Sequence, residues 1–402
     1  MKFVFKGKDA SGQIREGMVE ALNAKSAAEI LGRNGLVPIF VKEEKRTFAV
    51  VKSLEKIWEG VSQKELVTFF QQMATLVEAR VPIVSSLHTV AEQTTNHYFR
   101  ILLKEMADDI EDGVQFSVAL EKHPDTFSPL IINMLRAGEM SGELQKSIET
   151  VAGNIEKNYQ LAAKIKGALY YPAFVLGVAG IIGFLVVTFI LPKITLMIKD
   201  LDVPIPWYTA ALIWLGDFMN AYWWAVLLVF FAAMGGLVYY ARTENGRREW
   251  QMALLHIPVI GTLAQSIYIT RFSENLSTLL DAGIPVVRAL TIVSQVIGNV
   301  VFEKVVLQAA DEVRSGGTMS TVFVRSLQVP PIVAQMIRIG EETGSLTKVL
   351  GSVAKFYNQE VETTTKSLTT LIEPILIVVL GIGVGILVVG VLLPIYNIAS
   401  QM

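Results

Sequence analysis

The 402-residue sequence predicts an all-α membrane protein. We expect two tandem-duplicated cytoplasmic six-helix bundles, each followed by a transmembrane helix, with three membrane spans in total and a small N-terminal α/β unit. The first supporting observation is an internal repeat, because residues 134–152 and 336–354 are identical at nine of nineteen positions. The others are three long uncharged apolar segments and a charged fraction of only 18%, against roughly 25% in soluble domains.

Residues 1–42 are expected to form the α/β unit. Apolar runs predict three strands, at residues 3–5, 14–21 and 37–41. Ser26 followed by Glu29 has the spacing of a capping box at a helix start. This helix is expected to stop at Gly35, because glycine commonly follows the last helical residue. Residues 43–61 lack clear periodicity and are interpreted as a linker.

Two helical bundles are predicted, at residues 62–166 and 242–368. In the first bundle, apolar side chains recur at spacings of three and four, as in a helix that faces a core. They are Leu66, Phe69, Phe70, Met73, Leu76 and Val77. An Ala-x-x-Pro turn follows in both copies, and Pro82 and Pro285 are expected at helix starts, where the missing N–H of proline is tolerated. The last helix of each bundle is expected to lead directly into a span.

Three membrane spans are predicted, at residues 167–192, 221–241 and 371–397. Each provides the roughly 20 apolar residues that a helix needs to cross a hydrocarbon core of about 30 Å. Lys and Arg gather at the span ends that adjoin the bundles, whereas the segment 193–220 holds few basic residues. The positive-inside rule therefore predicts cytoplasmic bundles, a short periplasmic loop at 193–220, a cytoplasmic N-terminus and a periplasmic C-terminus.

A repeated Gly-Glu-x-Ser/Thr-Gly-x-Leu motif is the best candidate for a functional site. Its main residues in the two copies are Arg136, Glu139, Gly142, Arg338, Glu341 and Gly344. In a structural interpretation, Gly138 and Gly340 each end a helix. Ser141 and Thr343 then cap the next helix, and the glutamate accepts bonds from free amides at that helix start. In a functional interpretation, the glutamate carboxylate contacts a partner or an ion. The structural interpretation is favoured because both copies keep the motif between two helices.

A further pair of prolines occupies equivalent positions near the entrances of the first and third spans. They are Pro172 and Pro374, which we group with Pro82 and Pro285 as helix-turn prolines. Proline at the first position of a helix is ordinary. Alternatively, the two prolines near the spans set the angle between each bundle and the membrane.

Several classes of function lose support from the composition. Cysteine is absent, which excludes thiolate metal sites and cysteine nucleophiles, and a net charge of −2 gives no reason to expect nucleic-acid binding. The sequence contains no phosphate-binding loop, and its four histidines are scattered away from metal-ligand spacing. The apolar segments 167–192, 221–240 and 374–402 carry no charged side chain, which disfavours transport and intramembrane catalysis. We therefore expect no enzymatic activity, no catalytic residue, no cofactor and no metal.

With these features the sequence resembles the type II secretion F and type IV pilus PilC family over essentially its whole length. The resemblance rests on the frame Phe3-x-Phe5-x-Gly7-x-Asp9, the later Gly35-Leu-Val-Pro38, both duplicated motifs and the three-span layout. It implies an inner-membrane platform protein of bacterial cells that couples a cytoplasmic hexameric assembly ATPase to insertion of pilin or pseudopilin into a fibre. The implied partners also include a retraction ATPase, alignment-subcomplex membrane proteins, membrane lipid and further copies of the chain.

The resemblance also suggests the calcium site of some secretion relatives, with ligands at Gln93, Gln145 and Glu149. Gln145 stands where those relatives often have Asp, so a hard cation would lose a charged oxygen ligand and calcium is not expected. The alternative class of function is a membrane transporter or permease subunit, which is disfavoured by uncharged spans and by their small number. A signalling receptor is a third class, but the sequence has no recognisable kinase or nucleotide module.

Overall fold

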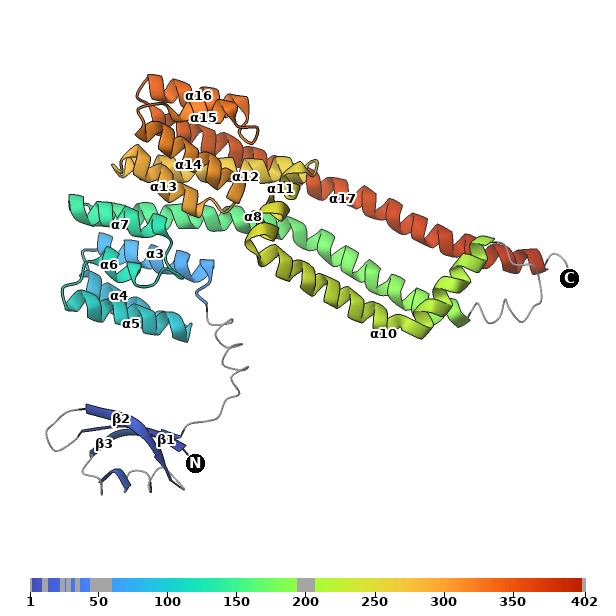
Figure 1. Ribbon diagram of the computed structural model, residues 1–402, viewed down its shortest axis with the longest axis horizontal. Helices are drawn as coiled ribbons and strands as arrows, with labels where there is room; N and C mark the ends of the chain where they lie inside the picture. The colour runs from blue at the N-terminus through green and yellow to red at the C-terminus, as the bar shows by residue number, and fades with distance from the viewer. Residues whose placement is uncertain are drawn as a thin grey trace. The chain divides into compact units, whose positions relative to one another are not determined.

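The computed structural model describes residues 2–8, 14–21, 26, 30–32, 37–43, 60–193 and 207–399. The chain divides into two compact units, which are described separately. The first comprises Met1–Gly60 together with Asn96–Tyr98, and the second comprises Val61–Thr95 together with Phe99–Met402. Helices make up most of the described residues (Figure 1).

Three antiparallel strands form most of the described part of the first unit. In the order β2-β1-β3 they are β2 (Ile14–Glu20), β1 (Lys2–Lys8) and β3 (Val37–Glu43). The pairing of β1 with β3 shifts register between Lys6 and Gly7. The strands lie where the sequence predicts them. Of the helix expected from Ser26 to Gly35, the structure describes Ser26 and residues 30–32, which are helical. The rest of this helix and most of the linker expected at residues 43–61 fall outside the described residues, so the α/β character of this unit stays a prediction.

Six helices form the first bundle within residues 60–193. They are α3 (Gln63–Glu78), α4 (Ile83–Gln93), α5 (His97–Glu111), α6 (Phe116–Glu121), α7 (Pro129–Ser141) and the first part of α8 (Leu144–Leu185). α3 begins at a capping box, in which the side chains of Ser62 and Glu65 each accept a bond from the backbone N–H of the other. Phe69 and Phe70 of α3 pack against Phe127, with ring centroids 6.1 and 6.2 Å apart. These rings are fully buried and form the centre of the core.

The second bundle repeats this plan within residues 207–399. Its six helices are α12 (Ile260–Asp281), α13 (Val286–Val296), α14 (Val300–Arg314), α15 (Met319–Arg325), α16 (Pro331–Glu342) and the first part of α17 (Leu346–Ala399). Phe272 of α12 packs edge-on against Phe323 of α15, with ring centroids 5.2 Å apart. One apolar core runs through both bundles. The predicted tandem duplication of a six-helix bundle is therefore confirmed.

Two long helices connect the bundles to the apolar part of the chain. α8 has 42 residues and α17 has 54, so at 1.5 Å per residue they extend about 63 Å and about 81 Å. α8 continues into a short π-helix, η1 (Val186–Ile190). α10 (Trp207–Arg242) then returns toward the bundles, and α11 (Glu244–His256) leads into α12 through a bend of 110° (Figure 1).

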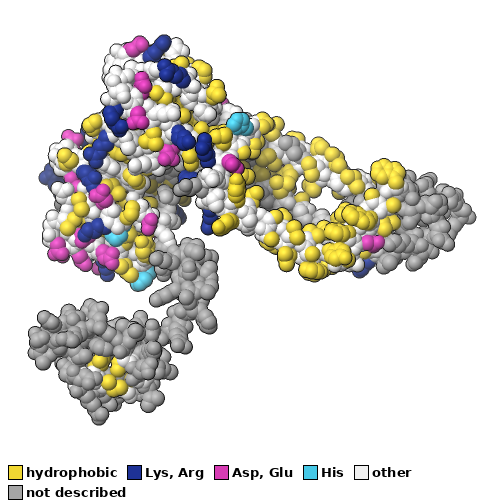
Figure 2. Space-filling view, in the orientation of Figure 1, with side chains coloured by type: hydrophobic (Ala, Val, Ile, Leu, Met, Phe, Trp, Pro, Cys, Tyr) yellow, Lys and Arg dark blue, Asp and Glu magenta, His cyan; other side chains and the backbone are white. Residues whose placement is uncertain are grey.

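The described residues contain three helical segments that are long and apolar enough to cross a membrane, which confirms the predicted number of spans. They are Leu144–Lys193, Ile213–Arg242 and Leu346–Ile386. At most 11% of the most apolar stretch of each segment is buried. Hydrophobic side chains cover the surface of this region, whereas charged side chains gather on the bundles (Figure 2). Such an extensive apolar surface is typical of a region that faces lipid or a partner.

The structure corrects two expectations about the apolar segments. Residues 207–220, which were expected to be loop, form the first half of α10, and this helix kinks at Tyr222 (φ −121°, ψ 17°). Pro172 and Pro374 do not lie at helix turns, because they fall inside α8 and α17. Proline removes one backbone hydrogen bond from a helix, but membrane helices tolerate it where local adjustments satisfy the freed carbonyl. Each bundle is therefore joined to its span by an uninterrupted helix.

Candidate functional site

Glu139 lies on α7 and binds the start of another helix. Its Oε2 accepts a hydrogen bond from the backbone N–H of Ser117 at 3.1 Å. Ser117 is the second residue of α6, whose N-cap residue Gln115 makes no side-chain capping bond. The first amides of a helix have no partner within the helix and carry partial positive charge, so an ionised carboxylate is stabilising there. Glu139 therefore caps α6 from a different part of the chain.

Glu341 does the same in the second bundle, with one more bond. Its Oε1 accepts from the N–H of Met319 at 2.8 Å, and its Oε2 accepts from the N–H of Ser320 at 3.2 Å. These are the first two residues of α15, and the N-cap residue Thr318 makes no side-chain capping bond. Both carboxylate oxygens of Glu341 are therefore used at the start of α15, as charge-assisted hydrogen bonds.

The structure corrects the expected target of this glutamate, which was the helix that follows the motif. In both copies the capped helix comes earlier in the chain, and its first bonded amide lies 22 residues before the glutamate. Ser141 and Thr343 do not cap the following helices either, because their hydroxyl groups donate to carbonyl oxygens of the preceding helix. The glutamate of the motif therefore fastens the helix that carries it to the start of the helix before it.

Within each copy of the motif, the first and second glycines have different roles. Gly138 and Gly340 lie inside α7 and α16 and do not end them, whereas Gly142 and Gly344 lie beyond the helix ends with φ of 74° and 66°. A side chain is strained at such positive φ, so the second glycine permits the turn. The first glycine permits close packing, since a Cβ atom at Gly138 would lie 2.0 Å from Oγ of Ser147 on α8.

The arginines of the motif differ between the copies. Arg136 forms an ion pair with Glu121 at the end of α6, so α7 holds α6 at both ends. Among the described residues, Arg338 pairs with Glu342 alone, one turn along its own helix, at 3.8 Å. Val324 occupies the repeat position of Glu121 and is 67% exposed. The glutamate cap is thus common to both copies, whereas the arginine contact to the capped helix is found in the first.

Pro82 and Pro285 are the N-cap residues of α4 and α13. Two positions before each proline, the backbone adopts the left-handed conformation, at Arg80 with φ 61° and at Gly283 with φ 77°. Glycine adopts this conformation without a steric penalty, but arginine does not. The turn is therefore the same in both copies, although only the second copy has the residue that suits it.

Hydrogen bonds between polar side chains join the two bundles beside the apolar core that they share. Nδ2 of Asn154 on α8 donates to Oδ1 of Asn275 on α12 at 3.2 Å, and both side chains are buried. Arg288 on α13 donates to Oδ1 of Asn133 on α7 at 2.8 Å. A buried amide pair favours one register between two helices, since any other register leaves an amide without a partner. No sequence motif marks these residues, and their only signal is a polar side chain on a mainly apolar helix face.

Glu274 on α12 is a further polar group between the bundles. Its Oε1 lies 3.4 Å from Nζ of Lys157 on α8. Burial raises the pKa of the Glu274 carboxyl above its ordinary value, and the nearby ammonium group of Lys157 offsets only part of this effect. Lys157 itself remains largely exposed, so the pair lies at the edge of the interface.

The three positions suggested for calcium make two hydrogen bonds between amide and oxygen groups. Oε1 of Gln93 accepts from Nε2 of Gln72, and Oε1 of Glu149 accepts from Nε2 of Gln145, both at 3.0 Å. These amide N–H groups compete with a cation for the two oxygens.

The described residues do contain one group of possible metal ligands that the spacing in the sequence does not reveal. One atom each of His88, Asp108 and Glu111 lies within 4.8 Å of the others, on α4 and α5. Both carboxylates of this group are exposed and the histidine is half-buried, and exposed acidic groups commonly occur without a metal. We assign it no role.

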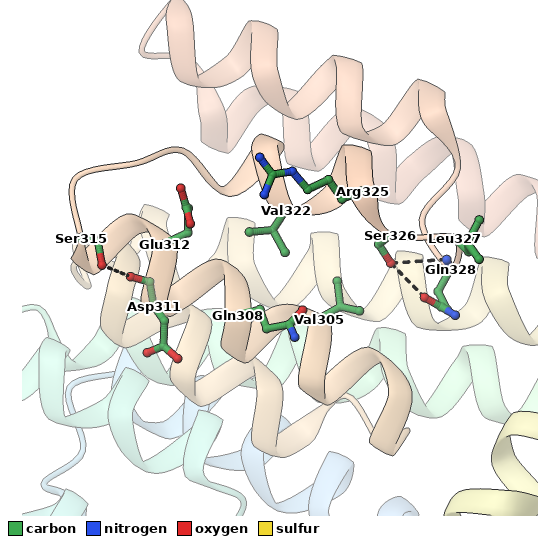
Figure 3. Close-up of a pocket in the computed structure, with 10 residues that line it drawn as sticks. All are labelled: Val305, Gln308, Asp311, Glu312, Ser315, Val322, Arg325, Ser326, Leu327 and Gln328. Atoms are coloured by element: carbon green, nitrogen blue, oxygen red, sulfur yellow. Dashed lines mark hydrogen bonds between the residues drawn. The ribbon is translucent and has the colours of Figure 1, made fainter.

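The second bundle carries an open cavity of about 580 Å³ between α14 and α15. Arg325 extends over it from α15, and Glu312 lies on the opposite wall (Figure 3). The hydroxyl group of Ser315 donates to the carbonyl oxygen of Asp311, and that of Ser326 donates to Oε1 of Gln328. Neither hydroxyl therefore donates to a general base, as a catalytic nucleophile would. The cavity therefore gives no support to a catalytic function.

Comparison with known proteins identifies the family. Residues 69–192 and 272–394 each match the family described as type II secretion system protein F, and residues 1–42 match its N-terminal domain. The type IV pilus assembly protein PilC of Thermus thermophilus is 34% identical over 401 residues, which cover 100% of this chain and 98% of the relative. The type II secretion system protein F of Xanthomonas campestris pv. campestris is 31% identical over 400 residues, which cover 98% of each chain.

The matched segments follow the repeat observed in the structure. Each takes in most of one bundle, its glutamate cap and the long helix that continues into a span. The three apolar helices and the names of the relatives agree with a protein of the bacterial inner membrane. The chain therefore belongs to the type II secretion system protein F family, which includes the type IV pilus assembly proteins named PilC.

Proposed function

We propose that this chain is the inner-membrane platform protein of a type IV pilus or type II secretion machine. In this role it couples a cytoplasmic hexameric assembly ATPase to the insertion of pilin or pseudopilin subunits into a fibre. Membership of the family and the names of the relatives support a place in such a machine. The observation that carries the coupling role is the continuity of α8 and α17, each of which belongs to a bundle at one end and to a span at the other.

A continuous helix transmits displacement because the hydrogen bonds along its backbone resist sharp bending. A shift or rotation of either bundle therefore moves the span attached to it. The bundles share one apolar core and the bond between Asn154 and Asn275, so a force on one bundle also reaches the other. The caps made by Glu139 and Glu341 hold α6 and α15 to the helices beside α8 and α17, so a load on the bundle surface reaches the long helices.

The proposed partners divide between the two parts of the molecule. The cytoplasmic bundle surfaces bind the assembly ATPase and a retraction ATPase. The exposed apolar faces of α8, α10 and α17 contact pilin helices, alignment-subcomplex membrane proteins, lipid and further copies of the chain. Lys and Arg near the bundle ends of the spans support a cytoplasmic N-terminus and a periplasmic C-terminus. The chain itself catalyses no reaction in this proposal.

Fibre assembly in the source bacterium tests the proposal. A null strain, and a strain with both Glu139→Ala and Glu341→Ala, should lack surface fibres or secreted substrate, as measured by electron microscopy and by assay of the culture medium. Glu342→Ala is the matched control, because it removes the neighbouring exposed glutamate and leaves the cap of α15 intact. Immunoblots of isolated membranes show whether each variant accumulates. Normal fibres and normal secretion in the null strain would contradict the proposal.

A further inference from the structure

A cavity of about 550 Å³ lies between α8 and α17, at the level where the two helices leave the bundles. Leu161, Lys164 and Ala168 form one wall and share a face of α8, at spacings of three and four residues. The other wall is a face of α17 that extends from Asn358 to Thr370. Beyond this level α8 and α17 continue as two separate helices toward their spans (Figure 1).

The inner part of this cavity is mainly apolar. Leu161 and Val361 belong to a small buried cluster with Leu263 of α12. Thr365 lies on the same wall and is buried, and its hydroxyl donates to the carbonyl oxygen of Val361 at 2.6 Å. The inner surface is therefore suited to methylene groups rather than to a charged ligand.

The rim of the cavity is basic. Nζ of Lys164 and Nζ of Lys366 lie 3.5 and 3.2 Å from oxygens of Glu362, and both lysine side chains are more than half exposed. Two ammonium groups and one carboxylate therefore lie at the rim, which leaves a formal excess of one positive charge.

These lysines lie next to the uncharged part of each helix. α8 has no charged side chain after Lys166 within its span, and α17 has one, Glu373, between Lys366 and the end of the sequence. Lysine side chains at the end of a membrane helix reach the depth of the lipid phosphate groups, because the ammonium group seeks the polar interface. The rim thus lies at the height of lipid headgroups when the spans are in a membrane.

We propose that this cavity binds an anionic phospholipid. The phosphate lies between Lys164 and Lys366, and the glycerol and first methylene groups lie against the apolar inner wall. Basic pockets between membrane helices bind anionic headgroups, and the apolar wall favours a lipid over a free anion. The bound lipid contacts both helices that leave the bundles and fixes their separation. This site requires that α8 and α17 enter a membrane, but it does not require the motor partner of the proposed function.

Native mass spectrometry of the full chain in detergent tests this site. The probe is phosphatidylglycerol, with phosphatidylcholine of the same acyl chains as the lipid without net charge. The variant with Lys164→Ala and Lys366→Ala should bind phosphatidylglycerol about tenfold more weakly, with no change for phosphatidylcholine. The matched control carries Lys146→Ala and Lys348→Ala, which remove one exposed lysine from each of the same helices 18 residues earlier (164 − 146 and 366 − 348). This control should bind like the unaltered protein.

Glu362→Gln distinguishes between two roles of these lysines, which are to bind a lipid or only to stabilise the fold through ion pairs. It removes the carboxylate that competes for both lysines, so phosphatidylglycerol should bind about threefold more tightly even though the ion pairs are lost. If the lysines serve only to hold Glu362, the variant would bind the lipid equally well or less well. Ala168→Phe fills the apolar wall and should weaken binding without any change of charge at the rim.

Inorganic phosphate tests whether the ligand is a lipid or a free anion. Millimolar phosphate should not displace phosphatidylglycerol, because phosphate makes no use of the apolar wall. Displacement by phosphate would indicate a free-anion site, and equal retention of both lipids would exclude selection by charge. Loss of binding in the Lys146 and Lys348 control would indicate attraction by the overall charge of the protein. Each of these three outcomes overturns the proposal.

Discussion

The two bundles keep the same glutamate cap but bury different faces. Leu130 on α7 is 5% exposed, whereas Ile332 at the equivalent position of α16 is 53% exposed. The reason is that α7 packs against α13 of the second bundle, while α16 makes its main contacts with α15 and α17 among the described helices. The cap therefore belongs to the internal architecture of each bundle, and the contact between bundles is a separate feature that uses each copy differently.

The equivalent faces of α13 and α4, one from each copy, also differ in exposure. Ile292 of α13 is buried one turn from Arg288, which contacts α7. Thr89, at the repeat position of Ile292 on α4, is exposed. When two copies pack head to tail, the contact joins two different faces, one from each copy. The other face of each copy is then left uncovered within the chain. Here the uncovered face of α4 is polar, while that of α16 carries Ile332 and Ile339, so the duplicated bundles present unlike surfaces.

The largest expected difference between the copies concerns the close packing of α7 on α8. Gly138→Ala should lower the free energy of local opening of α7 by about 3 kcal/mol, because the new Cβ would lie 2.0 Å from Oγ of Ser147. Gly340→Ala should cost less than about 1 kcal/mol, since its nearest contact would be 3.1 Å and alanine favours a helix. Hydrogen-exchange mass spectrometry measures both values. Equal costs at the two positions would show that the helices pack equally closely.

The next effect compares the two caps. Glu341→Ala should lower the opening free energy of α15 by about 2 kcal/mol, because two amides lose a charged acceptor. Glu139→Ala should cost α6 about 1 kcal/mol, because one amide loses its acceptor. Hydrogen exchange of the two capped helices reports the losses, and glutamine at either position should retain part of the bond. A greater loss in α6 than in α15 would count against this assignment.

A smaller effect is expected at the left-handed turn before α4 and α13. Arg80→Gly should raise stability by about 0.5 kcal/mol, because relief of the strained backbone exceeds the added chain entropy of glycine. Gly283→Arg should lower stability by about 1 kcal/mol for the reverse reason. Thermal unfolding of the full chain in detergent, followed by circular dichroism, measures both changes. Gly283→Asn is the control and should cost less than arginine, since asparagine tolerates this conformation.

The smallest effect depends on pH and concerns Glu274. Burial raises the pKa of this carboxyl, so the folded protein binds its proton more tightly than the unfolded chain does. The ionised form therefore opposes folding at neutral pH, and this opposition is lost as the pH falls through the raised pKa to below the ordinary value of 4.5. Glu274→Gln gives α12 the residue that α3 has at Gln71, and it should raise the Tm slightly at pH 7 and not at pH 4. A lower Tm for Glu274→Gln than for the unaltered protein at pH 7 would indicate a lowered pKa.

Local patterns in the sequence are enough to predict the bundles and spans. Apolar spacing, the internal repeat and uncharged segments each act over a few helical turns, and the structure contains the elements that they predict. Residues 207–220 show where such patterns fail. Their place between two predicted spans indicates a loop, but the limits of a span do not determine the backbone conformation of the residues beside it, and these residues are helical.

The candidate site is only partly predictable, because its contacts join residues that are far apart in the sequence. A glutamate next to helix ends predicts a cap, but nothing in the motif specifies which helix start it binds. The start of α6 approaches Glu139 only because the folded bundle places it there, 22 residues away along the chain. The amide pair of Asn154 and Asn275 is less predictable still, since 121 residues separate its members and neither lies in a motif.

The π-helix in the first span has a consequence for the far end of the molecule. Each residue of an α-helix advances by about 100° around the axis, whereas η1 closes each hydrogen bond over one additional residue. Side chains after Ile190 are therefore rotated less far around the helix axis than they would be in an unbroken α-helix. Leu191 lies against α10 at Gly216, where an added Cβ would be 3.3 Å from it. Its repeat counterpart Leu393 belongs to α17, which is α-helical over its whole length, so the two spans match in sequence but differ in rotational phase.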